Sequence, residues 1–275
     1  MRTAQAPNKK LTKLPDPPLL SACIVTHYAD TPYHAGRMEV VKMCLDTMIG
    51  GMKEFDYELL IWDNGSTPEF KEFIRSYNPH VLVESVNVGV HNARYHLANL
   101  ARGEILAQAD DDILFSPDWA TLQIQALRTF NAGIVSGSPY RYAFNWGQTK
   151  IIPDDIKVKR GQYIPEQWIR DAADSVGIDQ ISYLAGTRST QDVLLEKDGV
   201  QAWNHGHHIQ FMGKREIARN FLFPEDYYLA DGKRFNRACE AAGMLQVTTF
   251  ERTAIHIGNV VDPRIREIHK DWWNG

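Results

Sequence analysis

The sequence predicts an α/β fold: a single Rossmann-like domain with a mostly parallel central sheet, helices on both faces and an irregular C-terminal half. The first observation behind this prediction is that short apolar runs alternate with helical patterns from Leu19 to Gly137, as in βαβ units. The second is composition. Hydrophobic residues make up 44% of the 275 residues and charged residues 23%, which is typical of a globular domain with a sizeable core.

Each element of this alternation is predicted by its own pattern. Short apolar runs indicate buried strands, and apolar residues three or four positions apart indicate helices. Gly50 and Gly51 stop the first helix, and Pro117 lies near the start of the last helix in this half. In chain order we expect a strand at 19–26, a helix at 37–52, a strand at 57–62, a helix at 70–77, a strand at 81–83, a helix at 92–101, a strand at 104–109, a helix at 117–130 and a strand from 133; farther along, a helix at 235–242 and a strand at 245–250.

Composition also limits the class of protein. Residues 1–18 are rich in proline and lysine and are expected to form a mobile tail. The three cysteines lack a CxxC spacing, so they predict neither a disulfide framework nor a zinc site, and a reducing, cytoplasmic location fits them. No run approaches 18 apolar residues, so no transmembrane helix is expected. The net charge of −4 and the pI near 6.2 provide no overall basic field for nucleic acid.

Polar residues follow three of the predicted strands at the points where those strands end. They are Thr26, Asp63 and the run Asp110, Asp111 and Asp112. Because the carboxyl ends of parallel strands meet at one edge of a sheet, these three loops are expected to converge on one rim. Nucleotides bind at such rims in open α/β sheets, so the sequence predicts a nucleotide site there.

The aspartate run lies between two apolar segments, where unpaired carboxylates are costly to bury. Mg²⁺ and Mn²⁺ prefer oxygen ligands and are often held by one or two carboxylates together with substrate phosphates. If the strand continues through the run, Asp110 and Asp112 point to one side and Asp111 to the other. The alternative is a solvated loop in which Asp118 caps the next helix.

Four ordered segments of the first half resemble the inverting glycosyltransferases of family 2. They are CIVTHYAD at 23–30, LLIWDNGST at 59–67, NVGVHNARYHLANLARGEIL at 87–106 and ADDDILFSPDW at 109–119. Each segment is loose alone, but four in the right order at the right spacings are specific. The resemblance implies the glycosyltransferase A-type fold, with a nucleotide-sugar-binding half at 19–137 and an acceptor-binding, catalytic half at 138–275.

The resemblance also implies roles for four residues of the donor site. Thr26 and Tyr28 match positions that line the nucleotide, and Asp63 matches the aspartate that hydrogen-bonds the base, commonly uracil. Arg94 matches a basic residue near the diphosphate. Each residue also has a structural alternative: Thr26 as a strand end, Tyr28 as a half-buried aromatic ring, Asp63 as a turn former in DNGS and Arg94 as a surface arginine.

For the metal, the resemblance implies Mn²⁺ or Mg²⁺ held by Asp110 and Asp112, with Asp112 the surest ligand and Asp111 facing the donor sugar. His256 follows an apolar segment where a histidine of this family often completes the metal shell or touches the diphosphate. The alternative for His256 is a hydrogen-bonded core residue.

Inverting sugar transfer needs a general base that takes the proton from the acceptor hydroxyl. The segment LADGKRF at 229–235 resembles the Glu-Asp segment of the family, and Asp231 is the candidate base. Ala230 replaces the usual acidic neighbour, and the distance to Gly243 is slightly longer than typical. The competing candidate is Asp226, and either aspartate can instead be a helix N-cap.

Several other features allow two interpretations. His205 to His208 match no zinc motif, and with Trp203 they are candidates for lining the acceptor site. The aromatic residues at 140–146 form either a sugar-stacking wall or part of the core. Trp272 and Trp273 either pack on the domain or contact a partner, and the sequence does not choose between these.

The expected function is metal-dependent transfer of a sugar from a nucleotide-sugar donor, a UDP-sugar by the resemblance, to a hydroxyl of a glycan or small molecule. One alternative is a phage-type enzyme that acts on modified DNA bases, for which basic residues at 157–160 and at 214, 215 and 219 leave room. Another is a sugar-nucleotide-binding module without turnover. A nucleotidyltransferase is a third, but THYADTPYHAG lacks the glycine-rich, basic loop of that class.

Overall fold

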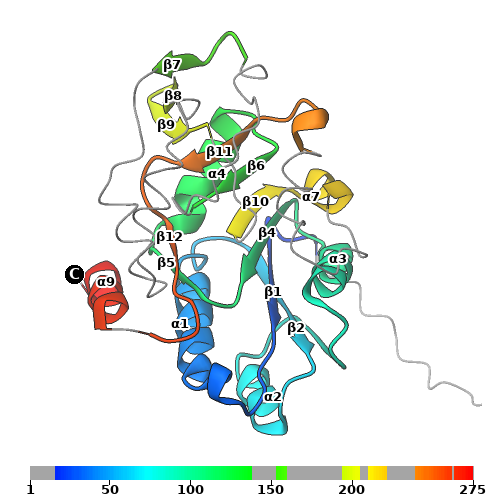
Figure 1. The fold of residues 1–275 in the computed structure, drawn as a ribbon. Coiled ribbons are helices and arrows are strands. Elements are labelled where there is room, and N and C mark those ends of the chain that lie inside the picture. Colours follow the sequence, from blue (N-terminus) through cyan, green and yellow to red (C-terminus); the bar gives the residue numbers. More distant parts are fainter. Residues whose placement is uncertain are drawn as a thin grey trace, which may run out of the picture.

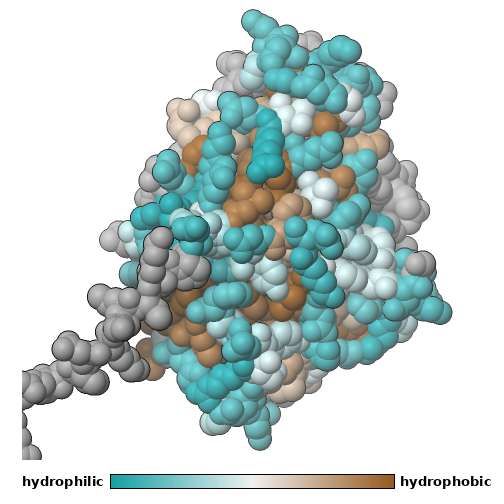
Figure 2. Space-filling view, turned by 180° about the vertical axis from the view of Figure 1, so that it is seen from behind, coloured by the Kyte–Doolittle hydropathy of each residue, from teal (hydrophilic) through white to brown (hydrophobic). Residues whose placement is uncertain are grey.

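The computed structural model describes residues 16–137, 153–159, 194–204, 210–221, 239–261 and 263–274. Figure 1 shows an elongated arrangement, with β2 and α2 at one end and the strands β7, β8 and β9 at the other. Figure 2, a view from behind, shows hydrophilic side chains spread over the whole face, with smaller apolar patches between them. No helix in the described part of the chain has the length and apolar character needed to cross a membrane.

A ten-stranded sheet forms the centre of the molecule. Its strands, from one edge to the other, are β3 (Val81–Ser85), β2 (Tyr57–Asn64), β1 (Leu20–Thr26), β4 (Ile105–Asp110), β10 (Gln210–Lys214), β6 (Ile134–Ser136), β11 (Gln246–Thr249), β9 (Val200–Trp203), β8 (Leu194–Lys197) and β7 (Lys157–Lys159). The first four strands are parallel, as are β6 and β11. β10 lies antiparallel between β4 and β6, and the last three strands add an antiparallel edge.

A second sheet has two strands in the described residues, β5 (Ile113–Phe115) and β12 (Ala254–His256), which pair antiparallel. The helices of the described residues are α1 (Arg37–Gly50), α2 (Pro68–Arg75), α3 (Val90–Leu100), α4 (Trp119–Thr129), α7 (Arg215–Phe221) and α9 (Pro263–Asn274), with a short 3-10 helix η1 (Pro32–His34). The strands and helices expected through residue 136 therefore all appear in order, and η1 and β5 are additional elements. The predicted α/β fold class is confirmed.

The helices cover both faces of the sheet because side chains of a strand alternate between its faces. Ala22 and Ile24 of β1 pack in one core cluster with apolar residues of α1, α2 and α4. Cys23 and Val25 pack in a second cluster with Ala93 and other residues of α3. Since β1 is buried along its whole length, it reads in sequence as a continuous apolar run and not as an alternation.

The C-terminal helix α9 is attached to the first half of the chain. The indole Nε1 of Trp273 donates a hydrogen bond of 2.9 Å to the carbonyl of Phe115 in β5. The same ring lies against Gly50, where an added Cβ would overlap it. Trp272 packs against a third apolar cluster that joins α1, β5 and the segment after β12, and the guanidinium of Arg252 lies 5.8 Å from its ring centroid. Both tryptophans therefore pack on the domain.

The buried carboxylate of Glu58 joins the amino ends of β1 and β2 to the loop before β4. Oε1 of Glu58 accepts hydrogen bonds of 2.6 Å from Ser21 Oγ and from the backbone amide of Arg102. Oε2 accepts a third bond, 3.0 Å long, from Arg102 Nε. Burial opposes ionisation, but these donors and the charge of Arg102 outweigh it, so the pKa of Glu58 lies below its ordinary value.

Candidate functional site

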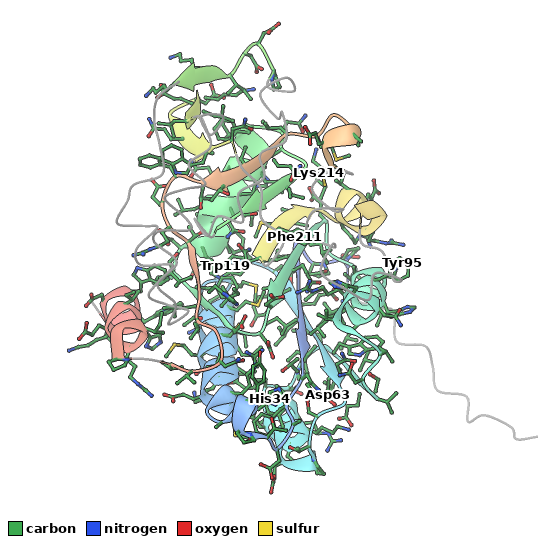
Figure 3. The ribbon with its side chains drawn as sticks, viewed as in Figure 1. His34, Asp63, Tyr95, Trp119, Phe211 and Lys214 are labelled. Atoms are coloured by element: carbon green, nitrogen blue, oxygen red, sulfur yellow. The ribbon has the colours of Figure 1, made fainter. Side chains whose placement is uncertain are left out.

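Parallel pairing brings the polar strand ends to one rim. Thr26 pairs with Asp63 across β1 and β2, and Val25 pairs with Asp110 across β1 and β4. Asp63 is labelled in the lower part of Figure 3, at the carboxyl end of β2. The convergence of Thr26, Asp63 and the aspartate run that the sequence predicts is therefore observed.

The three aspartates do not alternate as residues of a continuous strand. β4 ends at Asp110, and Asp111 and Asp112 form a turn before β5. Asp110 pairs with Arg94 of α3, whereas Asp111 and Asp112 both pair with Arg37 of α1. The alternation expected for an extended chain is therefore not observed, because the strand ends at Asp110. The metal-ligand roles of Asp110 and Asp112 stay a prediction.

Asp111 has both carboxylate oxygens occupied. Oδ2 accepts a hydrogen bond of 2.6 Å from Thr26 Oγ1, and Oδ1 is paired with the Arg37 guanidinium. Burial raises the pKa of this carboxyl above its ordinary value, and the negative charge of Asp112 adds to the rise, against the opposing effect of Arg37. Within the protein, Asp111 thus serves as an anchor between β1 and α1.

Asp112 lies beside His256. The imidazole Nε2 is 3.1 Å from Asp112 Oδ2, and the backbone amide of Ile257 donates a bond of 2.7 Å to the Asp112 carbonyl. The pairing of His256 with Ile113 in the small sheet fixes this approach. Burial opposes ionisation of Asp112, but His256 and Arg37 outweigh it, so its pKa is lowered. The pKa of His256 is raised, because the Asp112 carboxylate outweighs the effect of burial.

The remaining oxygen of Asp112 indicates what the pair can hold. Oδ1 is buried, and no described residue donates a hydrogen bond to it. Two ligands of an ion that binds oxygen at about 2.1 Å lie roughly 3 Å apart in octahedral geometry. The 3.1 Å between His256 Nε2 and Asp112 Oδ2 is of that size, and it is also the length of the ion pair that these two groups form here. Within the described ranges no three acidic, histidine or cysteine side chains form a ready metal cage, so an ion here needs ligands from elsewhere, such as substrate phosphates.

Arg37 is a site residue that the sequence analysis missed. Its Nη1 lies 3.2 Å from Asp112 Oδ2 and donates a bond of 3.0 Å to Asn259 Oδ1. Burial opposes its charged form, but the two aspartates outweigh burial and raise the pKa of Arg37. One signal was available: Arg37 is the first residue of α1, where a positive charge is unfavourable to the helix dipole unless carboxylates lie nearby.

The predicted base pocket lies around Asp63, which is fully buried. The backbone amide of Ser66 lies 3.3 and 3.4 Å from its two oxygens, and Lys71 Nζ lies 3.6 Å from Oδ2. The amide of Tyr28 donates a bond of 2.9 Å to Ser66 Oγ, and the Tyr28 ring stacks on Phe70 at 5.1 Å between centroids. These contacts fix the loops after β1 and β2 against each other.

The loop before α3 closes the same side of the rim. Oδ1 of Asn64 accepts a bond of 2.8 Å from the Val88 amide, and Asn64 Nδ2 donates one of 3.2 Å to Asn87 Oδ1. Gly65 has a φ of 87°, and a Cβ there would lie 2.8 Å from the Asn87 amide nitrogen. Glycine is therefore required at this turn for both backbone conformation and space.

Comparison with known proteins identifies the family. The model described as glycosyl transferase family 2 matches residues 34–176, just over half of the chain. The chain belongs to glycosyl transferase family 2. No curated protein matches the sequence.

Among solved structures, TarS shares the fold of this family member, and two other glycosyltransferases match with lower scores. Residues 1–349 of S. aureus TarS in complex with UDP match with a TM-score of 0.50 at 11% identity, over 86% of this chain and 59% of TarS. A mannosyltransferase of Pyrobaculum calidifontis in complex with GDP-Man and Mn²⁺ matches with a TM-score of 0.47 at 17% identity, over 84% of this chain and 55% of that one. Glucosyl-3-phosphoglycerate synthase of Mycobacterium tuberculosis matches with a TM-score of 0.48 at 13% identity, over 87% of this chain and 72% of that one. The chain thus spans 59% of the TarS structure, with the glycosyltransferase A-type fold.

Several predicted residues of this family 2 chain lie outside the described part of the structure. They are the candidate base Asp231, its competitor Asp226, His205 to His208 and the aromatic residues at 140–146. Trp203 is described, and it is buried and stacked on Phe250 at 5.7 Å between centroids. Its contacts are therefore those of a core residue.

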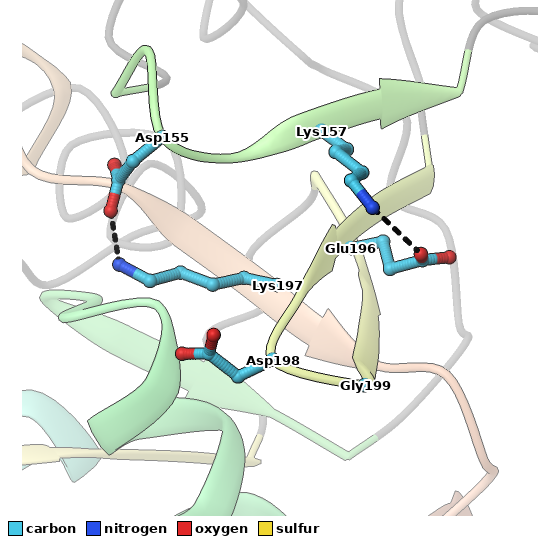
Figure 4. A pocket seen from close by; sticks show the side chains of 6 residues that line it. All are labelled: Asp155, Lys157, Glu196, Lys197, Asp198 and Gly199. Carbon is cyan, nitrogen blue, oxygen red and sulfur yellow. Dashed lines mark hydrogen bonds and ion pairs between the residues drawn. The ribbon is translucent and has the colours of Figure 1, made fainter.

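One pocket lies away from the aspartates, at the edge of the sheet farthest from β3. It measures about 410 Å³ and is lined by Asp155, Lys157, Glu196, Lys197, Asp198 and Gly199. Figure 4 shows Lys197 paired with Asp155, and Lys157 paired with Glu196 at 3.8 Å. Lys159 also pairs with Glu196, so the two described lysines of the basic stretch at 157–160 are compensated by a carboxylate. The chemistry described above does not involve this pocket.

Proposed function

We propose that the protein is a metal-dependent inverting glycosyltransferase that moves a sugar from a UDP-sugar to an acceptor hydroxyl. The observation that carries the proposal is the buried Oδ1 of Asp112 beside His256, to which none of the described residues donates a hydrogen bond, on the rim that Asp63 shares. A carboxylate oxygen without a donor is costly to bury unless a cation binds it. Family membership makes sugar transfer the reaction that this arrangement serves.

Asp112 and His256 are proposed to hold Mn²⁺ or Mg²⁺ together with the donor diphosphate, with Asp110 as a further ligand. When bound, such an ion neutralises the charge that develops on the departing diphosphate. The neutral form of His256 is the ligand, so binding through it releases a proton. Arg94, held by Asp110 at the carboxyl end of β4, supplies positive charge on the α3 side of the diphosphate.

The uridine preference is proposed for the pocket around Asp63. Its fixed carboxylate accepts a hydrogen bond from the base, and the loop that carries Tyr28 lies against it. Thr26 contributes by holding Asp111, which in turn is proposed to face the donor sugar. TarS, which shares the fold at 11% identity, has a crystal structure in complex with UDP.

The acceptor side is proposed to belong to residues 138–275, and the donor side to residues 19–137. Asp231 is the proposed base, which takes the proton from the acceptor hydroxyl as that oxygen attacks the anomeric carbon. A glycan or a small molecule is the proposed acceptor class, and a cytoplasmic location remains part of the proposal.

The test is release of UDP from a panel of nucleotide sugars, with Mn²⁺ or with EDTA. Asp112→Asn removes the free carboxylate at constant size, and Asp56→Asn makes the same change at an exposed position far from the rim. We expect slow, metal-dependent hydrolysis of one donor, reduced at least about 100-fold in Asp112→Asn and unchanged in Asp56→Asn. Metal-dependent hydrolysis that survives Asp112→Asn contradicts the proposal. Donor binding without any turnover favours a binding module.

A further inference from the structure

Arg37 joins three parts of the site through one guanidinium. Nη2 pairs with Asp111 Oδ1, and Nη1 lies between Asp112 Oδ2 at 3.2 Å and Asn259 Oδ1 at 3.0 Å. Its side chain is only 13% exposed, so water screens these charges little. Arg37 contacts Oδ2 of Asp112, and no described residue donates a hydrogen bond to Oδ1 of the same carboxylate.

The charges of the aspartate run are nearly balanced by the protein itself. The negative charges of Asp110, Asp111 and Asp112 are compensated by the permanent positive charges of Arg94 and Arg37. His256 adds a third positive charge when it is protonated. A site that binds a divalent cation alone normally keeps a surplus of carboxylates. Here a bare ion of charge +2 meets a nearly neutral cluster in which the guanidinium of Arg37 already contacts Asp112.

We propose that Arg37 couples metal binding to donor binding: it makes the ion bind weakly alone and tightly only with a nucleoside diphosphate. The inference rests on the proposed function. The diphosphate supplies the negative charge that Arg37 has removed from the carboxylates, so ion and diphosphate compensate each other. Coupling of this kind is reciprocal, so Mn²⁺ raises the affinity for UDP by the same factor as UDP raises the affinity for Mn²⁺.

A purely structural role for Arg37 makes a different prediction. If the guanidinium only fastens α1 to Asn259 and the aspartates, its loss lowers stability and weakens Mn²⁺ binding, because Asp112 is less well placed. If it opposes the ion, its loss strengthens Mn²⁺ binding in the absence of UDP. The sign of the change in Mn²⁺ affinity therefore separates the two roles.

The experiment measures Mn²⁺ affinity by titration calorimetry on the full chain at pH 8, with and without saturating UDP. Arg37→Gln removes the charge and keeps an amide donor for Asp111, and Arg37→Lys keeps the charge. Arg266→Gln is the matched control, since Arg266 is an exposed arginine that pairs with Glu39 of α1. Thermal unfolding checks that each variant is folded, and Arg37→Met replaces Arg37→Gln if the latter is not.

We expect UDP to tighten Mn²⁺ binding strongly in the wild type, in Arg37→Lys and in Arg266→Gln. In Arg37→Gln, Mn²⁺ alone should bind about tenfold tighter and the coupling factor should fall by a similar amount. Unchanged or weaker Mn²⁺ binding in folded Arg37→Gln overturns the inference and leaves the proposed function standing. A wild type that binds neither Mn²⁺ nor UDP overturns both.

Discussion

Replacing Glu58 with glutamine should destabilise the protein without touching the donor rim. The carboxylate is buried and accepts three hydrogen bonds, from Ser21 Oγ, the Arg102 amide and Arg102 Nε. Glutamine keeps one acceptor, removes the charge and turns an NH₂ group toward existing donors. Losing the charge from the retained bonds costs about 1 kcal/mol each, and an unsatisfied buried donor costs about 1–3 kcal/mol. Because Arg102 is one-third exposed, we expect a total of about 2–4 kcal/mol, near the lower end for a broken buried pair.

The pH dependence of this loss has a definite sign. Since the pKa of Glu58 is lower in the folded protein than its ordinary value of 4.5, its contribution is fully present above pH 4.5 and disappears as the pH falls through the folded value. Below that value the wild-type side chain is a neutral carboxylic acid and resembles glutamine. The difference between wild type and Glu58→Gln should therefore shrink in acid.

Urea unfolding at pH 7 and at several values below 4.5 measures the free energy of unfolding for both proteins. Glu104→Gln is the control, because Glu104 is exposed at the same end of the sheet and should change stability by less than about 0.5 kcal/mol. A loss below about 0.5 kcal/mol in Glu58→Gln at neutral pH, or a difference that stays constant into acid, would refute the reasoning.

Two further predictions concern the rim and the core. Asp63→Asn should weaken UDP binding roughly 10- to 100-fold, since a hydrogen bond to a charged acceptor contributes about 1.5–3 kcal/mol. Titration calorimetry measures the affinity for UDP, and an unchanged affinity would exclude a contact between Asp63 and the base. Gly51→Ala should lower the free energy of unfolding by about 1–3 kcal/mol, because the new Cβ would lie 2.6 Å from the indole nitrogen of buried Trp119. Thermal unfolding measures the change in stability, and an unchanged midpoint would mean that the Trp119 ring moves freely.

The first half of the fold was predictable because its elements form from local patterns. The predicted helix at 117–130 corresponds to α4 at Trp119–Thr129, and the predicted strand at 104–109 corresponds to β4 at Ile105–Asp110. The insertion of β10 between β4 and β6 was not predictable, because it depends on pairing between distant residues such as Gln210 and Ala109. The short strands β5 and β12 were not predicted, because they also depend on pairing between distant residues.

The site was predictable where parallel strand order decides it. Thr26 and Asp63 share a rim because the carboxyl ends of neighbouring parallel strands lie at the same edge of the sheet. The direction of each aspartate was not predictable, since a turn after Asp110 breaks the alternation. Arg37 was missed because a sequence shows an arginine at the start of a helix without showing which carboxylates fold against it.

The attachment of α9 affects the order in which the site can form during synthesis. Trp273 bonds to the carbonyl of Phe115, which precedes it by 158 residues, and His256 reaches Asp112 only when β12 pairs with β5. Since chains fold from the amino end as they leave the ribosome, the aspartates emerge long before their histidine and the helix that fastens β5. A shortened or fused carboxyl terminus is therefore expected to disturb the pair of Asp112 and His256 at the rim, although α9 itself packs on α1 and β5.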